Sequence, residues 1–168
     1  MSMKDYHTIV AGTDGSGLAD QVIARAAWLA VRDDADLVVV CAFSELPRRT
    51  EARNMATLGG DARLGQVLGR AAAGQALQAA TVTARDEGAS VAAALLVDGE
   101  PAMALLTTAE ERSADLIVLG AIQDRSLIDR LLGTVATEVT KRAGCDVLIV
   151  RPTGVGGDLG VSEDAPPA

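Results

Sequence analysis

The stretch DLIVLGAIQDRSLIDRLLGTVATEVTKRAG, residues 115–144, decides the fold. It opens with an apolar run that stops at Gly120, continues through a charged loop, and restarts as a helical pattern after Gly133. A continuous run of Ile, Val and Leu is typical of a strand covered by helices on both faces. We therefore expect a buried strand at 115–120, a loop with a glycine at each end, and a helix with Thr134 as its N-cap and Gly144 at its end.

Four more short apolar runs, each bounded by turn signals, lie outside this stretch, at residues 7–12, 36–43, 90–97 and 146–150. Helical patterns fill the gaps between them. We expect helices at 17–34 with Ser16 as N-cap, at 62–86 despite several glycines, at 101–113 with Pro101 in the first turn, and at 134–144. Alternating strands and helices predict a single doubly wound α/β domain, a parallel sheet with about four helices on its two faces.

The 168 residues are enough for one domain with a proper core, which we place at 1–151. The tail 152–168 has the composition of a disordered segment. The polar loop 44–60 is too long for a simple connector and is either a mobile excursion or a lid, the former being favoured.

Charge and composition exclude several classes of partner. The net charge of −8 argues against wide nucleic-acid binding, which needs clustered Lys and Arg, but not against a small anion held by backbone N–H groups. No apolar run reaches the about 18 residues that a membrane span needs, and the first residues do not resemble a signal peptide, so we expect a cytoplasmic protein. Cys41 and Cys145 have no metal-binding spacing and are interpreted as reduced packing residues.

A ligand of such a sheet lies at the carboxyl ends of the strands, where the winding reverses. There Thr13 and Asp14 follow the first strand, and Asp14 either contacts a ligand or serves as a turn residue. Gly133 and Thr134 begin a helix whose free N–H groups favour phosphate, and they equally suit a simple turn and cap.

Gly120, Gln123, Gly133 and Thr134 stand at the spacing of the motif G-x2-G-x9-G-[ST], with Gln123 in place of the second glycine. This pattern, TIVAGTDGS at 8–16 and RLLGTVATEVTKRAGCDVLIVRP at 130–152 resemble the universal stress protein family, and the resemblance covers residues 5–151.

The resemblance implies a five-stranded parallel sheet of order 3-2-1-4-5, a homodimer paired through strand 146–151, and an adenine-nucleotide site for ATP, with possible Mg²⁺, or for cyclic AMP. Three groups of residues would form that site: Thr13, Asp14 and Ala42 around adenine and ribose; Val97 and Gly99 on the wall; and Gly120, Gly133, Thr134 and Val135 at the phosphates.

Gln123 leaves two functions open. A side chain at this position hinders a close approach of phosphate, yet Gln123 can itself donate a hydrogen bond, and Arg125 and Arg130 can supply charge. The chain is then either a nucleotide-binding stress-response module or a dimeric interaction module that has lost the ligand. No hydrolase or Walker motif is present, so we expect a binding protein and not an enzyme, with any ATP hydrolysis slow and incidental.

Overall fold

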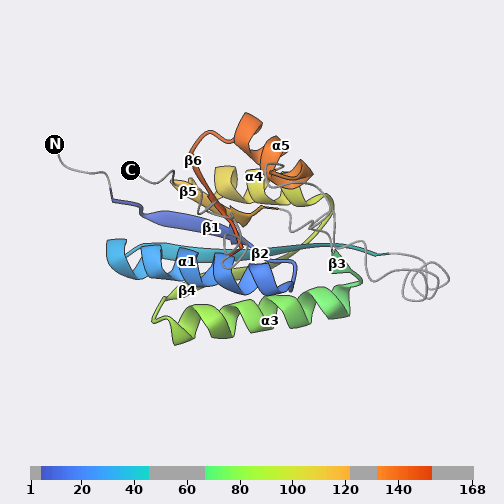
Figure 1. Cartoon of the computed structure of the whole chain (residues 1–168), viewed down its shortest axis with the longest axis horizontal. Helices are drawn as coiled ribbons and strands as arrows, with labels where there is room; N and C mark the ends of the chain where they lie inside the picture. The colour runs from blue at the N-terminus through green and yellow to red at the C-terminus, as the bar shows by residue number, and fades with distance from the viewer. Residues whose placement is uncertain (1–4, 46–66, 122–131, 153–168) are drawn as a thin grey trace, which may run out of the picture.

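The computed structural model describes residues 5–45, 67–121 and 132–152, in which strands and helices alternate along the chain (Figure 1). The elements, in chain order, are β1 Thr8–Gly12, α1 Gly17–Asp33, β2 Asp36–Ser44, β3 Val67–Leu68, α3 Arg70–Asp86, β4 Val91–Asp98, α4 Pro101–Glu111, β5 Leu116–Gly120, α5 Thr134–Arg142 and β6 Asp146–Val150. The predicted alternation is confirmed.

The five long strands form one parallel sheet in the order β4-β2-β1-β5-β6. Numbered along the sequence as five strands, this is the expected order 3-2-1-4-5. Ile9 in β1 pairs with Leu37 of β2 on one side and with Leu116 of β5 on the other, so β1 is central. The winding reverses between β1 and β5, which places the switch point at their carboxyl ends.

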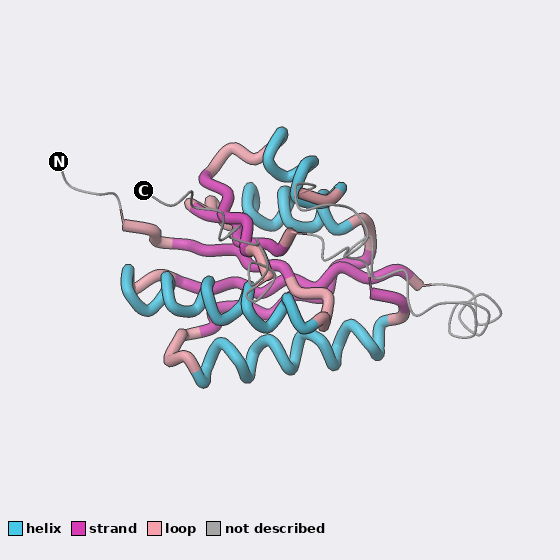
Figure 2. The backbone as a smooth tube through the Cα atoms, viewed as in Figure 1, coloured by secondary structure: helices cyan, strands magenta, loops and turns pink. Residues whose placement is uncertain are grey.

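Helices cover both faces of the sheet, as predicted. Figures 1 and 2 show α1 and α3 on one side and α4 and α5 on the other. Alternate strand residues feed the two layers: Ile9 and Ala11 pack with α1 and α3, while Val10 packs with α4 and α5. In β2, all residues of 37–43 are buried, which explains why that strand is apolar without interruption.

Two helix starts differ from the predictions. α3 begins at Arg70 and not at 62, because Gly69 has a φ of +86° and turns the chain from β3 into the helix. In α5 the N-cap is Gly133, with a φ of +80°, so that Thr134 is the first helical residue. Ser16 and Pro101 do begin α1 and α4 as expected. The predicted helix end also moves slightly, since α5 stops at Arg142, before Gly144.

Few large apolar side chains among the described residues are exposed. Trp28, the only tryptophan of the chain, is 52% exposed on α1, and the Arg32 guanidinium lies 5.5 Å from its ring centre. Cys41, in contrast, is fully buried in the core. Within the described ranges, every helix is too short or too polar to cross a bilayer.

Candidate functional site

The carboxyl ends of β1 and β5 lie side by side. Ala11 of β1 is in register with Val118 of β5, so Thr13 and Asp14 leave the sheet next to Gly120. Thr13 stays attached to the other neighbour, since its N–H donates to the Val40 carbonyl oxygen at 2.9 Å. The switch point thus brings together two segments separated by more than a hundred positions.

The turn after β1 is built from side-chain acceptors. Thr13 Oγ1 accepts from Gly15 N at 3.3 Å, and Asp14 Oδ1 accepts from Ser16 N at 2.9 Å. The turn role foreseen for Asp14 is therefore real. It uses one oxygen of a half-buried carboxylate, and no donor in the described part of the chain contacts Oδ2.

The Asp14 carboxylate also affects the pKa of Cys41 in the neighbouring strand β2. Burial, and secondarily the Asp14 carboxylate, raises the pKa of the Cys41 thiol to about 11. The thiol therefore stays protonated near neutral pH, which fits the predicted packing role.

Gly120 has a packing role that the sequence did not reveal. A Cβ atom at this position would lie 2.9 Å from Leu18 Cδ2 and 3.2 Å from Val22 Cγ2, both on α1. The next residue, Ala121, donates its N–H to the Val150 carbonyl oxygen at 2.9 Å and so prolongs the pairing with β6. The glycine lets α1 lie close to the end of β5, whatever else it contacts.

α5 begins at the same edge of the sheet, because it must return the chain to the start of β6, which is parallel to β5. Its N-cap, Gly133, provides no side-chain acceptor. Thr134 is exposed, and Val135 packs against the α4 and α5 layer. A helix start of this kind presents backbone N–H groups and the positive end of the helix dipole to an anion.

The remaining predicted residues lie on the other side of β1. Ala42 at the end of β2 is in register with Val97 of β4, and both pack on the α4 and α5 face. Gly99 follows with a φ of +137° and donates its N–H to the Phe43 carbonyl oxygen at 2.9 Å. The carboxyl edge thus carries all the predicted site residues except Gln123 and Arg130, which lie outside the described residues, as does most of loop 44–60 and of tail 152–168.

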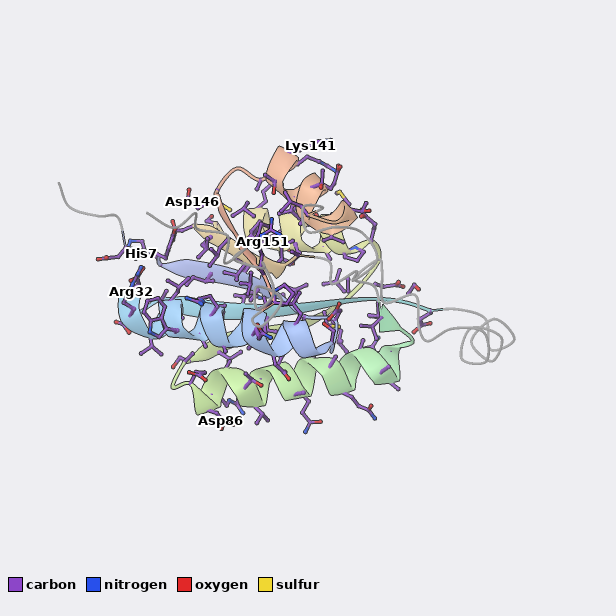
Figure 3. All side chains as sticks on the ribbon, viewed as in Figure 1. His7, Arg32, Asp86, Lys141, Asp146 and Arg151 are labelled. Carbon is purple, nitrogen blue, oxygen red and sulfur yellow. The ribbon has the colours of Figure 1, made fainter. Side chains whose placement is uncertain are left out.

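A polar cluster at the opposite, amino end of the sheet was not predicted. Asp115 Oδ2 accepts from His7 N at 2.7 Å and from Thr8 N at 3.0 Å. Tyr6 donates its N–H to Asp33 Oδ2 at 2.9 Å and its hydroxyl to Asp146 Oδ2 at 3.1 Å. Figure 3 shows His7, Arg32 and Asp146 gathered at this end, away from β3. The available signal was the aspartate at or just before the start of three strands, at 36, 115 and 146.

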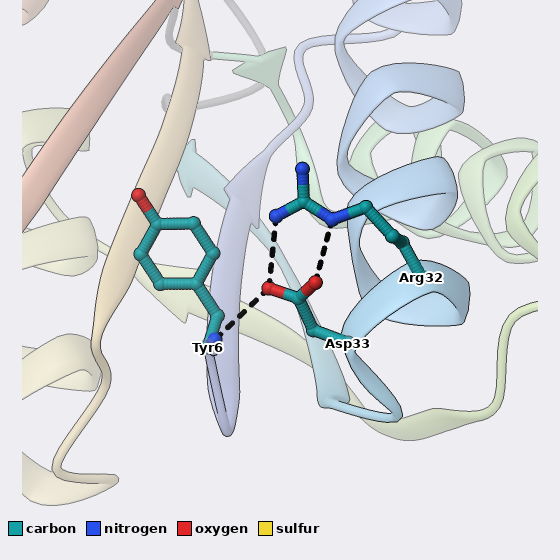
Figure 4. Close-up of polar contacts among 3 residues, drawn as sticks. All are labelled: Tyr6, Arg32 and Asp33. Carbon is teal, nitrogen blue, oxygen red and sulfur yellow. Dashed lines mark hydrogen bonds and ion pairs between the residues drawn. The ribbon is translucent and has the colours of Figure 1, made fainter. Parts of the chain in front are cut away.

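Within this cluster the Asp33 carboxylate is held by two groups (Figure 4). Arg32 Nε lies 2.6 Å from Asp33 Oδ1, and the Tyr6 N–H reaches Oδ2. The hydrogen bonds from Arg32 and then from the Tyr6 backbone lower the pKa of Asp33 to about 2. These contacts fix the entry into β1 and leave no obvious role for a ligand.

A groove of about 450 Å³ runs between α4 and the end of α5. Leu106, Ala109 and Ile117 are among its apolar lining residues, and Arg142 stands in its wall. Arg142 already contacts Glu138 Oε1 at 3.2 Å, and Glu110 adds an acidic group to the same lining. As for metals, no group of three His, Cys, Asp or Glu side chains among residues 5–45, 67–121 and 132–152 is placed to hold an ion.

Comparison with known sequences matches the range over which the sequence resembles the universal stress protein family. Residues 5–151 match the model of the universal stress protein family. Universal stress protein Rv1636 of Mycobacterium tuberculosis is 36% identical over 151 residues, covering 90% of this chain and all of that protein. Universal stress protein MJ0531 of Methanocaldococcus jannaschii is 32% identical over 151 residues, covering 87% of this chain and 82% of its own.

Solved structures agree with the sequence comparison. A universal stress protein in complex with cAMP has a TM-score of 0.64 and 30% identity, over 88% of this chain and 98% of that one. The Archaeoglobus fulgidus universal stress protein in complex with dAMP has a TM-score of 0.59 and 26% identity, over 87% of this chain and 98% of its own. With its family pattern over residues 5–151 and a 36% identical relative matched over its full length, the chain belongs to the universal stress protein family.

Proposed function

We propose that the protein binds an adenine nucleotide at the carboxyl edge of the sheet and acts as a ligand-responsive regulatory module of the stress response. The observation that carries this proposal is the meeting of Asp14 with the end of β5 at the switch point, on the edge where α5 also starts without a side-chain cap. The similar structures in complex with cAMP and dAMP support the choice of ligand class.

Each part of the edge has a physical role in this proposal. Asp14 Oδ2 accepts a hydrogen bond from a ribose hydroxyl, since Oδ1 is taken by the turn. The N–H groups that begin α5 at Gly133 and Thr134 hold phosphate. Mg²⁺ would accompany ATP and offset phosphate charge in a chain of net charge −8. We propose binding without turnover, because the only histidine, His7, stands at the amino end of β1.

Titration calorimetry with ATP and with cyclic AMP, each with and without Mg²⁺, tests the site directly. We expect the wild-type protein to bind one of them and Asp14→Asn to bind at least about tenfold more weakly. The Asn oxygen keeps the turn by accepting from Ser16 N, which leaves an NH₂ group, a donor, where the ribose needs an acceptor.

Asp86→Asn is the matched control, because it removes the same charge from an exposed position near the end of α3. Its affinity should equal that of the wild type. Equal binding by Asp14→Asn, or no binding by the wild type, would contradict the proposed site.

A Gln123→Gly variant separates the two functions left open by the sequence. It restores the motif glycine, and tighter binding than the wild type is expected if Gln123 hinders the phosphates. Binding by the variant alone would show that this chain has given up the ligand and kept the scaffold.

The second candidate function, a dimeric interaction module, rests on β6. Among the described strands β6 pairs only with β5, and Val147, Leu148, Ile149 and Val150 are half-buried. An open apolar edge favours strand pairing with a second copy. We expect Ile149→Lys to weaken self-association at least about tenfold, measured by analytical ultracentrifugation.

Ala92→Lys is the control for this variant, since it puts the same charge on β4, the opposite edge of the sheet. It should sediment like the wild type. A monomeric wild-type protein, or a dimer that Ile149→Lys leaves unchanged, would sink the dimer proposal.

A further inference from the structure

The two-residue strand β3 lies in line with β1, beyond the point where β1 ends. β1 stops at Gly12, and its last contact with β2 is the bond from Thr13 N to the Val40 carbonyl oxygen. β2 runs on to Ser44, and β3 pairs with this extension, Val67 in register with Phe43 and Leu68 with Ser44. Gly69 N then donates to the Ser44 carbonyl oxygen at 3.0 Å.

The direction of the β2 carbonyls shows which side β3 occupies. The Val40 and Ser44 carbonyls accept from Thr13 and Gly69, whereas the Phe43 carbonyl accepts from Gly99, next to β4. Because successive carbonyls along a strand point to opposite sides, Val40, Ala42 and Ser44 all face the β1 side. β3 therefore covers the backbone edge of β2 that includes Ala42.

That edge includes Ala42, which the family resemblance places around the adenine and ribose of a bound nucleotide. We propose that β3 is a built-in competitor of the nucleotide: it pairs with β2 in the free protein and must leave that edge when the base binds. This inference rests on the proposed function. If the inference holds, nucleotide binding changes the structure at the start of α3 in addition to filling the site.

β3 is suited to such an exchange. A pairing of two residues contributes few hydrogen bonds, and short strand ends open at low cost. Gly69, with its φ of +86°, allows the sharp corner between β3 and α3. One contact opposes release, since the Arg70 guanidinium lies 5.9 Å from the centre of the Phe43 ring.

Two proline variants test the competition. Because Gly69 N points at β2, Val67 N points there too and Leu68 N points away. Val67→Pro removes a donor from the pairing, whereas Leu68→Pro places the same residue where no such donor is lost. If β3 covers the edge most of the time, Val67→Pro should bind ATP or cyclic AMP at least about fivefold more tightly than the wild type, and Leu68→Pro within about twofold of it.

Hydrogen exchange provides a second readout on the wild-type protein. The Gly69 amide should be protected in the free protein and should exchange faster at saturating nucleotide. Unchanged or weaker binding by Val67→Pro, an equal gain in Leu68→Pro, or unchanged Gly69 protection would overturn the competition while leaving the nucleotide site in place. Failure of the wild type and both variants to bind would instead refute the proposed function, and this inference with it.

Discussion

The two ends of the parallel sheet are built differently. At the amino end, carboxylates of Asp33, Asp115 and Asp146 accept hydrogen bonds from the residues that lead into β1. At the carboxyl end, α3, α4 and α5 all begin without a side-chain cap. At the carboxyl end Ser16 does cap α1, but the starts of α3, α4 and α5 leave their first N–H groups without a side-chain acceptor.

Residues with positive φ show the same contrast. At the amino end, Asp34 and Ser113 adopt this conformation alongside Gly88, so side chains are tolerated there. At the carboxyl end all the examples among residues 5–45, 67–121 and 132–152 are glycines, at positions 15, 69, 99 and 133. Backbone without side chains is what the close approach of a ligand requires, so the difference agrees with the proposal that the nucleotide binds at the carboxyl end.

Gly120 provides the strongest test of this comparison, because it is a glycine at the carboxyl end whose presence is explained by packing alone. Gly120→Val should lower the free energy of unfolding by about 3 kcal/mol, because its side chain would collide with Leu18 and Val22. Urea denaturation measures the loss. Gly74→Ala in α3, where a Cβ meets nothing within 4 Å, should instead gain about 0.5–1 kcal/mol. If Gly120→Val lowers the free energy of unfolding by less than an ordinary surface substitution does, packing does not explain this glycine and only a ligand-related role is left for it.

At the amino end, Asp115→Ala should cost about 2 kcal/mol, because the backbone N–H groups of His7 and Thr8 lose their acceptor. Nucleotide affinity should stay the same if the two ends are independent. Asp36→Ala, at the exposed start of β2, is the matched aspartate and should change stability by less than about 0.5 kcal/mol. Weakened nucleotide binding in Asp115→Ala would show that the ends are coupled.

The smallest expected effect concerns pH. Asp33 has a folded-state pKa of about 2, below its ordinary value of 3.8, so its contribution to stability is present above about pH 4 and is lost as the pH falls toward 2. The stability difference between the wild type and Asp33→Asn should therefore be largest near neutral pH and shrink in acid. Denaturation curves at pH 6 and pH 2.5 measure it, and a constant difference would mean that the charge of Asp33 contributes nothing.

Local patterns predicted most of the fold. Buried strands such as 36–43 are continuous apolar runs because helices cover both faces, and Ser16 caps α1 through a bond to Ala19 N only three residues away. The start of α3 was missed for a different reason. Residues 67–68 pair with the end of β2, a non-local contact that a helical pattern with scattered glycines does not reveal.

The site was predictable in position and less so in detail. Strand order places Asp14 beside Gly120, and that order followed from the family resemblance. Thr134 is a better N-cap by residue preference, yet Gly133 takes the cap position with a backbone angle that disfavours any side chain. The collision that Gly120 avoids depends on where Leu18 lies in three dimensions, which spacing in the sequence does not give.

The fluorescence of Trp28 can report whether ligand binding at one end of the sheet changes the structure at the other end. Trp28 is the only tryptophan of the chain and lies in the second half of α1, which is nearer the amino end of the sheet. The Arg32 guanidinium lies over its indole ring. A nucleotide bound at the proposed site would lie at the opposite end of the sheet from Trp28. A change in tryptophan emission on adding ligand would thus show that the effect of binding reaches the far end of α1. Unchanged emission would confine that effect to the carboxyl edge of the sheet.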